Sequence, residues 1–312
     1  MPVNDQISPR VRAASRCPDC EGQLTWSEED AHCSSCTKRF IIARGVPLLL
    51  PTRGSLFKAE LVAAAPAMRT ARAGMRRFLP SISRNVVAER NYRTIRSSVS
   101  NLAKPALVLI LGGGESGKGS SVLYGPGVEV VLSDVAISDS TDVCLDAHCI
   151  PFADGTFDVV VAQAVLEHVV DPQQCVAEIH RVLRNDGLVY AETPFMQQVH
   201  LGAFDFTRFS LLGHRRLFRM FREVDSGVAV GPGSALAWAF VYLVTSFSRG
   251  PRSRRWLSAG ARYAAFWLKY LDRPLEGRPA AADAASGVFF LGRKADIPIE
   301  DEELISTYSG GL

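Results

Sequence analysis

The sequence has little that would place the protein in a membrane, on nucleic acid or in a secretory pathway. The apolar stretch Ala235 to Phe247 has 13 residues, whereas a membrane-spanning helix needs about 20. The net charge of +3 is too small to indicate nucleic-acid binding by itself. Residues 1–16 are polar and mixed, without the charged-then-apolar order of a signal sequence, and we expect them to form a disordered tail. These absences favour an ordinary globular protein.

Cysteine is scarce and unevenly placed. Four of the seven cysteines form two C-x-x-C pairs, Cys17 with Cys20 and Cys33 with Cys36. An odd total fits a cytoplasmic, metal-binding chain better than a secreted disulfide framework. Each pair makes a knuckle with two thiolates, and two knuckles complete a tetrahedral zinc site without an open position. The pattern predicts structural Zn²⁺, with a vestigial or redox-active dithiol as the alternative.

The central feature of the chain is an apolar run, Leu107 to Leu111, that leads directly into three glycines at 112–114. Such a run is typical of a strand buried on both faces of a parallel sheet. The glycines permit a sharp turn and the close approach of a ligand. ATP or GTP, NAD and S-adenosylmethionine are the ligands we consider. The phosphate-loop pattern fails because Gly119 stands where a hydroxyl must reach magnesium, and the G-x-G-x-x-G pattern of NAD sites is only a weak match.

Strand and helix patterns alternate regularly after residue 107, which predicts an α/β fold with a doubly wound, mostly parallel sheet. The second strand, Val128 to Leu132, is followed by Asp134. An acidic residue about 20 positions after the glycine turn is where a ribose diol is held. This spacing fits NAD and S-adenosylmethionine equally.

Two longer segments carry specific resemblances. Residues 17–51, which end in G-V-P-L-L-L-P, resemble the zinc ribbons that activate tRNA, ribosome and release-factor methyltransferases. Residues 146–169 and 178–190 resemble the D-A-x-x-L-P-F and E-x-x-R-V-L signatures of class I S-adenosylmethionine-dependent methyltransferases of the quinone-biosynthesis type. The second resemblance covers about 105–226, with Val288 to Lys294 as the last strand. It implies a seven-stranded sheet and S-adenosylmethionine as cofactor.

The resemblance also implies the cofactor-binding residues. The glycine turn would pack on the methionine moiety, Asp134 would take the ribose hydroxyls, and Gln163 would face the sulfonium. Asp146 would accept from the adenine amino group beside the backbone of Ala147. The implied cofactor set is therefore Gly112, Gly113, Gly114, Asp134, Asp146, Ala147 and Gln163. Ile110 departs from the family, which usually has an acidic residue there.

Catalytic candidates lie after the fifth strand, where such folds keep their substrate loops. His200, Asp205 and Arg208 are the polar groups most able to touch an acceptor or act as a base. Asp205 and Arg208 fit a pair that fixes the loop equally well. Glu167 and His168 fit polar residues at a helix start better than catalytic groups. Ser210 is expected to begin an amphipathic helix that runs to Phe221.

The predicted domains follow from these segments. The ribbon (17–51) is joined by a helical connector (52–104), which carries Arg69, Arg72, Arg76 and Arg77, to the methyltransferase domain (105–296); an acidic tail (297–312) closes the chain. A helical insertion at about 232–284 holds aromatic residues and arginines. We expect it either to pack as a hairpin over the substrate pocket or to contact a membrane surface peripherally.

The acceptor is predicted from what the substrate loop and the ribbon lack. Thr193-Pro194-Phe195 replaces the Asn-Pro-Pro-Tyr-type tetrad of amide- and base-amine methyltransferases, and the ribbon has no dense basic stripe. We therefore predict a small-molecule or lipid-linked acceptor and no nucleic-acid partner. The alternatives are a tRNA or translation-factor methyltransferase and a catalytically degenerate binding module, which Ile110 favours.

Overall fold

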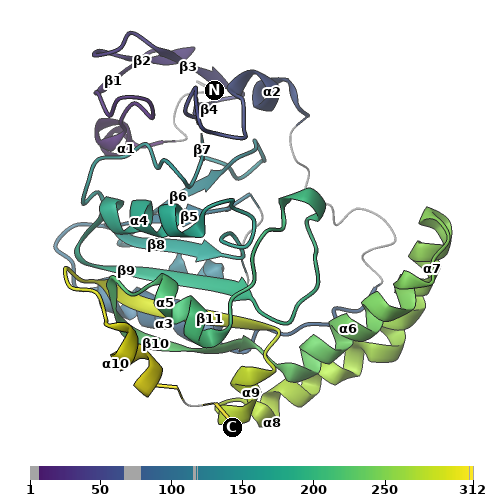
Figure 1. The fold of residues 1–312 in the computed structure, drawn as a ribbon. Coiled ribbons are helices and arrows are strands. Elements are labelled where there is room, and N and C mark those ends of the chain that lie inside the picture. The colour runs from purple at the N-terminus through teal and green to yellow at the C-terminus, as the bar shows by residue number, and fades with distance from the viewer. Residues whose placement is uncertain (1–6, 67–78, 115–116, 118, 309, 312) are drawn as a thin grey trace.

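The computed structural model describes residues 7–66, 79–114, 117, 119–308 and 310–311. The predicted basic run at Arg69, Arg72, Arg76 and Arg77 lies outside the described residues. A single mixed sheet organises the fold (Figure 1). Its strands are β1 (Leu24–Trp26), β2 (Asp30–Cys33), β3 (Arg39–Ala43), β4 (Val46–Leu49), β5 (Ala106–Leu111), β6 (Val128–Asp134), β7 (Val143–Leu145), β8 (Phe157–Gln163), β9 (Leu183–Pro194), β10 (Phe221–Val230) and β11 (Gly287–Lys294).

The seven strands from β5 to β11 form the predicted methyltransferase sheet, in the order β7-β6-β5-β8-β9-β11-β10. Strands β5 to β9 pair in parallel, and β11 pairs antiparallel with both β9 and β10. The order changes direction at β5, so the glycine turn after β5 lies at the switch point of the sheet. The predicted fold class is confirmed.

Helices cover both faces of the sheet, which explains the unbroken apolar runs of its strands. On one face, Leu107, Leu109 and Leu111 pack in a cluster with α4 (Pro172–Val182). On the other, Val108 and Ile110 pack with α3 (Ala88–Val99). Successive β5 residues therefore alternate between two separate cores, as the two-residue period of a strand requires.

The four-cysteine segment is built into the same sheet. Strand β4 pairs in parallel with β7, with Leu48 opposite Cys144 and Leu49 opposite Leu145. Cys17, Cys33 and Phe40 lie in the core cluster that also contains Leu107. This four-cysteine segment thereby covers an edge of the seven-stranded sheet that would otherwise present unpaired backbone groups.

The predicted disordered tail is wrong for residues 7–16; residues 1–6 lie outside the described part. Helix α1 (Pro9–Ala14) is capped by Ser8, and Val11 is buried. The chain then runs along the segment after β7, because the Arg16 N–H donates to the Pro151 carbonyl (2.9 Å) and the Ala153 N–H donates to the Ala14 carbonyl (2.9 Å). Apolar Ile7 and Val11 join the main core, which the polar composition of this segment conceals.

Two predictions about the C-terminal half also need correction. The amphipathic helix α5 (Leu211–Leu217) begins after Ser210 as predicted but ends before Phe221, which starts β10. The acidic tail, for which the sequence analysis names no helix, contains a short one, α10 (Asp301–Ser306). Buried Leu304 and ion pairs from Arg216 and Arg219 to Asp301 hold α10 against the body.

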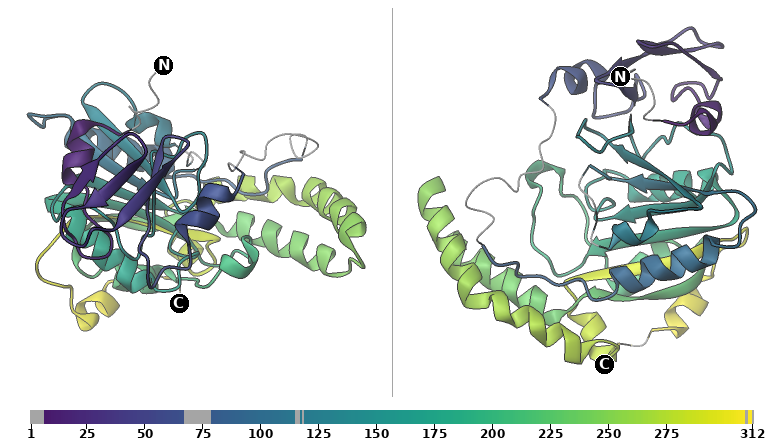
Figure 2. Two further views of the ribbon diagram at one scale, coloured as in Figure 1. Left: turned by 90° about the horizontal axis from the view of Figure 1, so that it is seen from above. Right: turned by 180° about the vertical axis from the view of Figure 1, so that it is seen from behind.

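The insertion is a helical hairpin that projects from the body (Figures 1 and 2). It consists of α6 (Pro232–Ser246), α7 (Pro251–Ala265), η4 (Phe266–Leu271), α8 (Asp272–Leu275) and α9 (Pro279–Asp283). The base packs on the segment before α3, where Lys269 donates to the Ser81 carbonyl and Ile82 joins the hairpin core. A hydrogen bond from the Tyr242 hydroxyl to the Val199 carbonyl links the hairpin to the loop after β9.

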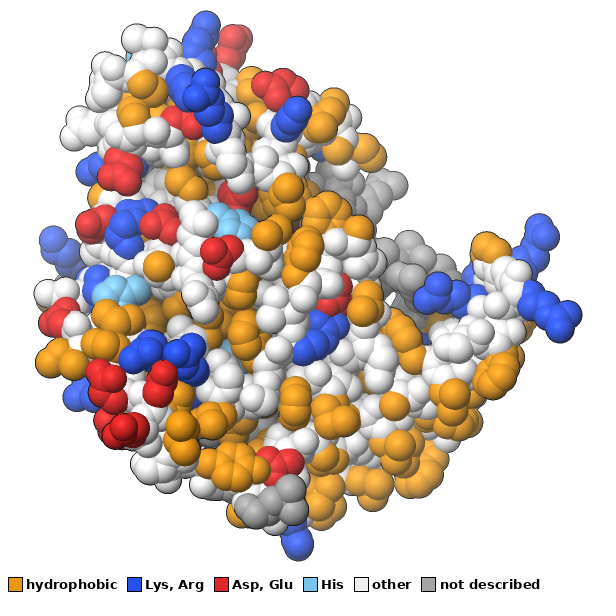
Figure 3. All heavy atoms as spheres, in the orientation of Figure 1, with side chains coloured by type: hydrophobic (Ala, Val, Ile, Leu, Met, Phe, Trp, Pro, Cys, Tyr) orange, Lys and Arg blue, Asp and Glu red, His pale blue; other side chains and the backbone are white. Residues whose placement is uncertain are grey.

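Each long helix of the hairpin leaves an apolar stripe exposed. Leu236, Phe240, Leu243 and Phe247 recur along α6 and its end, and Trp256, Tyr263, Trp267 and Tyr270 along α7 and η4. Figure 3 shows hydrophobic side chains along the convex side of the hairpin and basic side chains at its tip. Among the described residues, no helix is long and apolar enough to span a bilayer. The stripes are thus surface features.

Candidate functional site

The glycine turn and Asp134 form one preorganised unit at the carboxyl ends of β5 and β6. The Gly114 N–H donates to Asp134 Oδ2 (3.0 Å), and the Gly113 N–H donates to the Ser133 carbonyl (2.8 Å). A Cβ at Gly114 would lie 2.6 Å from Asp134 Oδ2, and Gly112 has φ +67°. These glycines are therefore required both by backbone conformation and by the close approach of the carboxylate.

The segment after the glycine turn argues against a phosphate ligand. Within its described residues, the only helix before β6 is a short 3₁₀ helix, η2 (Ser120–Leu123), preceded by Gly119 with φ +84°. A phosphate loop or a dinucleotide turn holds its phosphates on the N-terminus of a full α-helix. The turn instead suits a ligand held by a carboxylate and by backbone groups.

Asp146 and Ala147 follow β7 and are both buried. The Asp146 carboxylate already accepts from the Ser55 hydroxyl (2.6 Å), the His148 N–H (3.0 Å) and His148 Nδ1 (2.6 Å). The connector after the ribbon thus crosses this edge of the sheet. A carboxylate offers about four acceptor positions, so one remains for a further donor.

Gln163 ends β8 and belongs to a buried polar network that the sequence analysis missed. Its Nε2 donates to Glu192 Oε2 (2.8 Å), and its Oε1 accepts from the Tyr92 hydroxyl (3.2 Å). Glu192 also accepts from Asn85 Nδ2 (2.8 and 2.9 Å) and from the Tyr190 hydroxyl. In sequence, a glutamate near the end of an apolar strand is the only sign of this network.

Ile110 stands where related enzymes carry an acid, and it lies buried in the apolar cluster with α3. Glu192 lies on the same face two strands away and two residues closer to the carboxyl edge, because Ile110 pairs with Val161 and Val161 with Tyr190. Asp134 lies on the same face and is nearer to Ile110, because its strand β6 is adjacent to β5 and pairs Leu132 with Ile110. The carboxylates beside Ile110 on this face therefore come from β6 and β9, not from β5.

The loop after β8 brings Glu167, His168 and His200 together. Residues 164–171 form turns, and α4 begins only at Pro172 with Asp171 as its cap, so the predicted helix start at Glu167 is wrong. His168 Nε2 and His200 Nε2 each lie 3.8 Å from Glu167 Oε1. Burial raises the pKa of Glu167 to about 8 and lowers the pKa values of both histidines.

This loop also bears on the glycine turn. Ala164 has φ +57°, and its N–H donates to the Glu192 carbonyl (3.0 Å). Val165 follows and lies so close to Gly112 that a Cβ there would be 2.6 Å from Val165 Cγ2. A non-glycine residue in the left-handed region carries strain that its surroundings must offset. The strained residue, Ala164, thus precedes a loop that packs on the glycine turn through Val165 and carries Glu167 and His168.

Asp205 and Arg208 form a partly buried ion pair within the loop after β9. Arg208 Nη2 donates to Asp205 Oδ2 (2.9 Å), and Arg208 Nε donates to the Gln197 carbonyl (2.8 Å). The Asp205 side chain is 1% exposed and accepts from the His200 N–H (2.8 Å). The Arg208 guanidinium lowers the pKa of Asp205 to about 2. This geometry fixes the loop and the position of His200.

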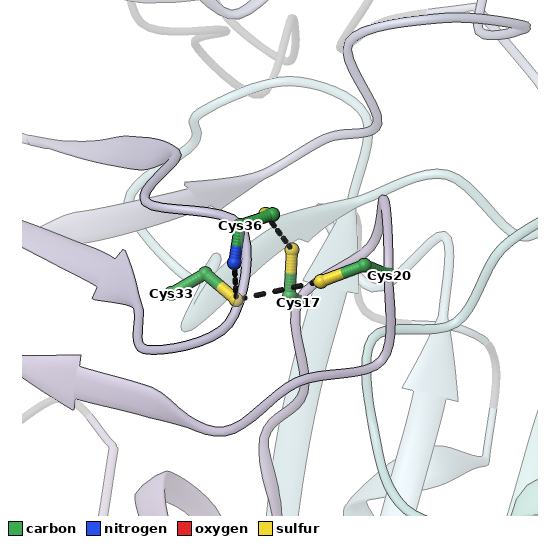
Figure 4. A group of neighbouring side chains, drawn as sticks. All are labelled: Cys17, Cys20, Cys33 and Cys36. Carbon is green, nitrogen blue, oxygen red and sulfur yellow. Dashed lines mark hydrogen bonds between the residues drawn. The ribbon is translucent and has the colours of Figure 1, made fainter.

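The four N-terminal cysteines converge on one centre (Figure 4). The Sγ atoms of Cys17 and Cys36 are 3.7 Å apart, and those of Cys20 and Cys33 are 3.4 Å apart. These distances exclude disulfides and lie near the roughly 3.8 Å edge of a tetrahedron with 2.3 Å Zn–S bonds. A Cβ at Gly22 would lie 2.8 Å from Cys33 Sγ. The cluster is consistent with zinc binding.

A cavity of about 460 Å³ lies away from these residues. It is lined by Phe195, Arg215, Glu223, Asp283 and Tyr308, among others. Its walls come from α5, β10, α9 and the C-terminal segment, so it shares only the start of the loop after β9 with the glycine-turn site. We assign the candidate site to the carboxyl edge of the sheet, where the convergent polar groups lie.

Comparison with known proteins agrees with this geometry. Residues 126–191 match the methyltransferase domain family described as Methyltransf_11. The chain therefore contains a class I S-adenosylmethionine-dependent methyltransferase domain, and this family implies S-adenosylmethionine as the cofactor.

Individual relatives resemble only parts of the chain. An uncharacterized 37.1 kDa protein in transposon TN4556 of Streptomyces fradiae is 38% identical over 69 residues, which is 22% of this chain and 16% of that protein. Among solved structures, phosphoethanolamine N-methyltransferase 2 of Haemonchus contortus has 15% identity and a TM-score of 0.44, covering 66% of this chain and 53% of its own. The 1,6-didemethyltoxoflavin-N1-methyltransferase of Burkholderia thailandensis has 17% identity and a TM-score of 0.38, covering 67% and 80%.

Proposed function

We propose that the protein transfers a methyl group from S-adenosylmethionine to a small-molecule or lipid-linked acceptor. The observation that carries this proposal is the bond from the Gly114 N–H to Asp134 at the switch point of the sheet. Asp134 would hold the ribose hydroxyls, and Gly112, Gly113 and Gly114 would allow the methionine part to approach the backbone. Asp146 would use its remaining acceptor position for the adenine amino group, beside Ala147.

The chain's own groups would mainly position the reactants. S-adenosylmethionine supplies a methyl group on a sulfonium that an acceptor lone pair can attack in line, so orientation and exclusion of water give much of the rate. Gln163, held by Glu192 and Tyr92, would face the sulfonium. His200 would lie nearest the acceptor, and Asp205 with Arg208 would hold His200 in place.

Calorimetric titration with S-adenosylhomocysteine tests the cofactor site. Asp134→Ala should weaken binding by about 1.5–3 kcal/mol, the range for a lost hydrogen bond to a charged group, or about 10- to 150-fold. Asp139→Ala is the matched control, because Asp139 lies in the same loop but is exposed. A flat titration of the folded wild-type protein would refute the proposal.

The binding-module alternative has specific support. Ile110 gives the cofactor's amino group no carboxylate from β5, and the Asp146 carboxylate already accepts from Ser55 and His148. Measurable binding of S-adenosylhomocysteine without methyl transfer to RNA, protein or lipid fractions of a cell extract would favour this alternative. Methylation of the RNA or protein fraction alone would favour a tRNA or translation-factor methyltransferase.

The projecting hairpin supports a lipid-linked acceptor. Its exposed apolar stripes lie next to Arg249, Arg252, Arg254 and Arg255, all exposed at the tip. Aromatic side chains at headgroup level with arginines on phosphates are the features of an interfacial element. We expect the protein to sediment with phosphatidylserine vesicles more than with phosphatidylcholine vesicles. Trp256→Ser with Phe247→Ser should abolish the difference, and Ile297→Ser, an exposed apolar control elsewhere, should retain it.

Cys17, Cys20, Cys33 and Cys36 would hold a structural zinc ion. The ion would fix the two knuckles, and strand β4 at the end of the ribbon would then complete the sheet edge beside β7. A four-thiolate site has no open position for a substrate. Zinc therefore contributes to stability in this proposal and takes no part in the methyl transfer.

A further inference from the structure

We propose that Glu167, His168 and His200 form a binding site for a divalent transition-metal ion beside the cofactor site. One carboxylate oxygen and two imidazole nitrogens lie within 4.8 Å of one another. Two histidines and one carboxylate with open positions are a donor set typical of Fe²⁺ and related ions such as Mn²⁺, Co²⁺ and Zn²⁺. The role of the ion in methyl transfer rests on the proposed function, whereas binding of the ion can be tested independently of that function.

The hydrogen bond of His168 directs a lone pair toward Glu167. His168 Nδ1 lies 2.7 Å from the Phe204 carbonyl, which can only accept, so Nδ1 carries the proton and Nε2 has the lone pair. His200 Nδ1 lies 3.3 Å from Asp205 Oδ2 and 3.5 Å from Gln197 Nε2, which can only donate. The proton of a neutral His200 can therefore sit on either ring nitrogen, and Nε2 has the lone pair when Nδ1 is protonated. A ring nitrogen bonded to a carbonyl or carboxylate, with the other nitrogen facing inward, is the usual arrangement of a metal-binding histidine.

Glu167 provides an independent reason to place a cation here. Its side chain is 1% exposed, and its Oε2 has no hydrogen-bond partner among the described residues. Its Oε1 faces two imidazole nitrogens at 3.8 Å, too far for a hydrogen bond. The buried Glu167 carboxyl oxygen and the lone pair of His168 Nε2 thus face each other, an arrangement that a bound cation or a proton on Glu167 stabilises.

The cluster is preformed and needs little adjustment. The Phe206 N–H (2.8 Å) and Thr207 N–H (3.3 Å) donate to the Glu167 carbonyl, which fixes the loop after β9 against the loop after β8. Donor atoms of an ion with bonds of about 2.1 Å lie roughly 3.0–3.4 Å apart. The two separations from Glu167 Oε1 are 3.8 Å, and all three donor atoms lie within 4.8 Å of one another, so side-chain rotation must bring them closer by about half an ångström or more.

The ion would act on the acceptor. The His200 side chain is 25% exposed, so one side of the cluster is open for further ligands. A divalent cation lowers the pKa of a bound hydroxyl and orients it. The proposal therefore specifies an acceptor with an oxygen group, such as a hydroxyl next to a second oxygen ligand, and makes His200 a metal ligand instead of a proton acceptor.

Electron paramagnetic resonance of Mn²⁺ tests the site on the full zinc-loaded chain. Mn²⁺ prefers oxygen and nitrogen donors, so the four thiolates do not compete for it. We expect the wild-type protein to bind one equivalent. Glu167→Gln, which keeps size and polarity, and His200→Gln should each weaken binding at least tenfold. His180→Gln is the matched control, because His180 contacts the Ala295 carbonyl outside the cluster.

Titration of the same samples with S-adenosylhomocysteine separates the two proposals. Retained S-adenosylhomocysteine binding with lost Mn²⁺ binding in the Glu167→Gln protein would support a distinct metal site in a folded protein. No Mn²⁺ binding by a wild-type protein that binds S-adenosylhomocysteine, or equal Mn²⁺ binding by wild-type and both variants, would overturn the metal site alone. Mn²⁺ binding without any cofactor binding would leave the metal site in place and refute the proposed function.

Discussion

His214 is a buried imidazole whose removal should make the protein more resistant to acid. It lies in α5 with 0% exposure, and neither ring nitrogen has a hydrogen-bond partner among the described residues. Its ring packs edge-on against Phe218, 5.1 Å between centroids, and near Phe209 at 6.1 Å. Burial lowers the pKa of His214 from its ordinary 6.5 to about 3. The perturbation is His214→Phe, with His214→Leu as a smaller alternative.

The magnitude follows from proton linkage. A histidine whose pKa is depressed in the folded state is neutral in both the folded and the unfolded state above pH 6.5. In that range its titration therefore does not lower the free energy of unfolding. As the pH falls below 6.5, the unfolded chain binds a proton that the folded protein cannot accept until about pH 3. The free energy of unfolding therefore falls by up to about 1.4 kcal/mol per pH unit across this window. Between pH 7 and pH 5 the loss from His214 is about 2 kcal/mol.

Urea unfolding at pH 7 and pH 5 measures this loss. The drop in unfolding free energy between the two pH values should be about 2 kcal/mol smaller in His214→Phe than in the wild-type protein. The difference between the two proteins cancels the contributions of all other titrating groups. His180→Gln controls for the loss of any histidine. Equal drops in wild-type and His214→Phe proteins would show that the buried ring is hydrated or paired in solution and would refute the reasoning.

Two further predictions concern the zinc cluster and the hairpin. Cys33→Ala should abolish zinc binding, which elemental analysis measures. It should also lower the melting temperature, because Cys33 lies in the core cluster shared with the sheet. Zinc retained at one equivalent would contradict the four-thiolate site. Buried Asp272 accepts from the Gly233 N–H (2.8 Å), the Ser234 N–H (3.2 Å) and the Ser234 hydroxyl (2.5 Å). Asp272→Ala should therefore lower the free energy of unfolding, measured with urea, by about 3 kcal/mol. The hairpin of this variant should also be cleaved more readily in limited proteolysis. A change below about 1 kcal/mol would mean that these donors find other partners.

Some features of this protein follow from short-range spacing alone. The run from Leu107 into three glycines, the acid at Asp134 and the paired cysteines are local patterns, because each depends on a strand, a turn or a knuckle of a few residues. The order of strand and helix patterns likewise predicts the parallel sheet, since both of its faces are covered and its strands read as unbroken apolar runs. Hydrophobic periodicity is weaker for residues 7–16 and 301–306, where one or two apolar side chains dock a short helix.

The tertiary structure alone decides which polar groups meet. Ser55 reaches Asp146 across 91 positions and Asn85 reaches Glu192 across 107, and Glu167 faces His200 only because two loops share backbone hydrogen bonds. The pairing of β4 with β7, which joins the ribbon to the sheet, is equally long-range. Periodicity reports which face of an element is buried but not what lies opposite it. Packing between distant segments decides which partner each buried polar group has. Burying such a group costs free energy, and a hydrogen bond offsets this cost only where the two segments meet.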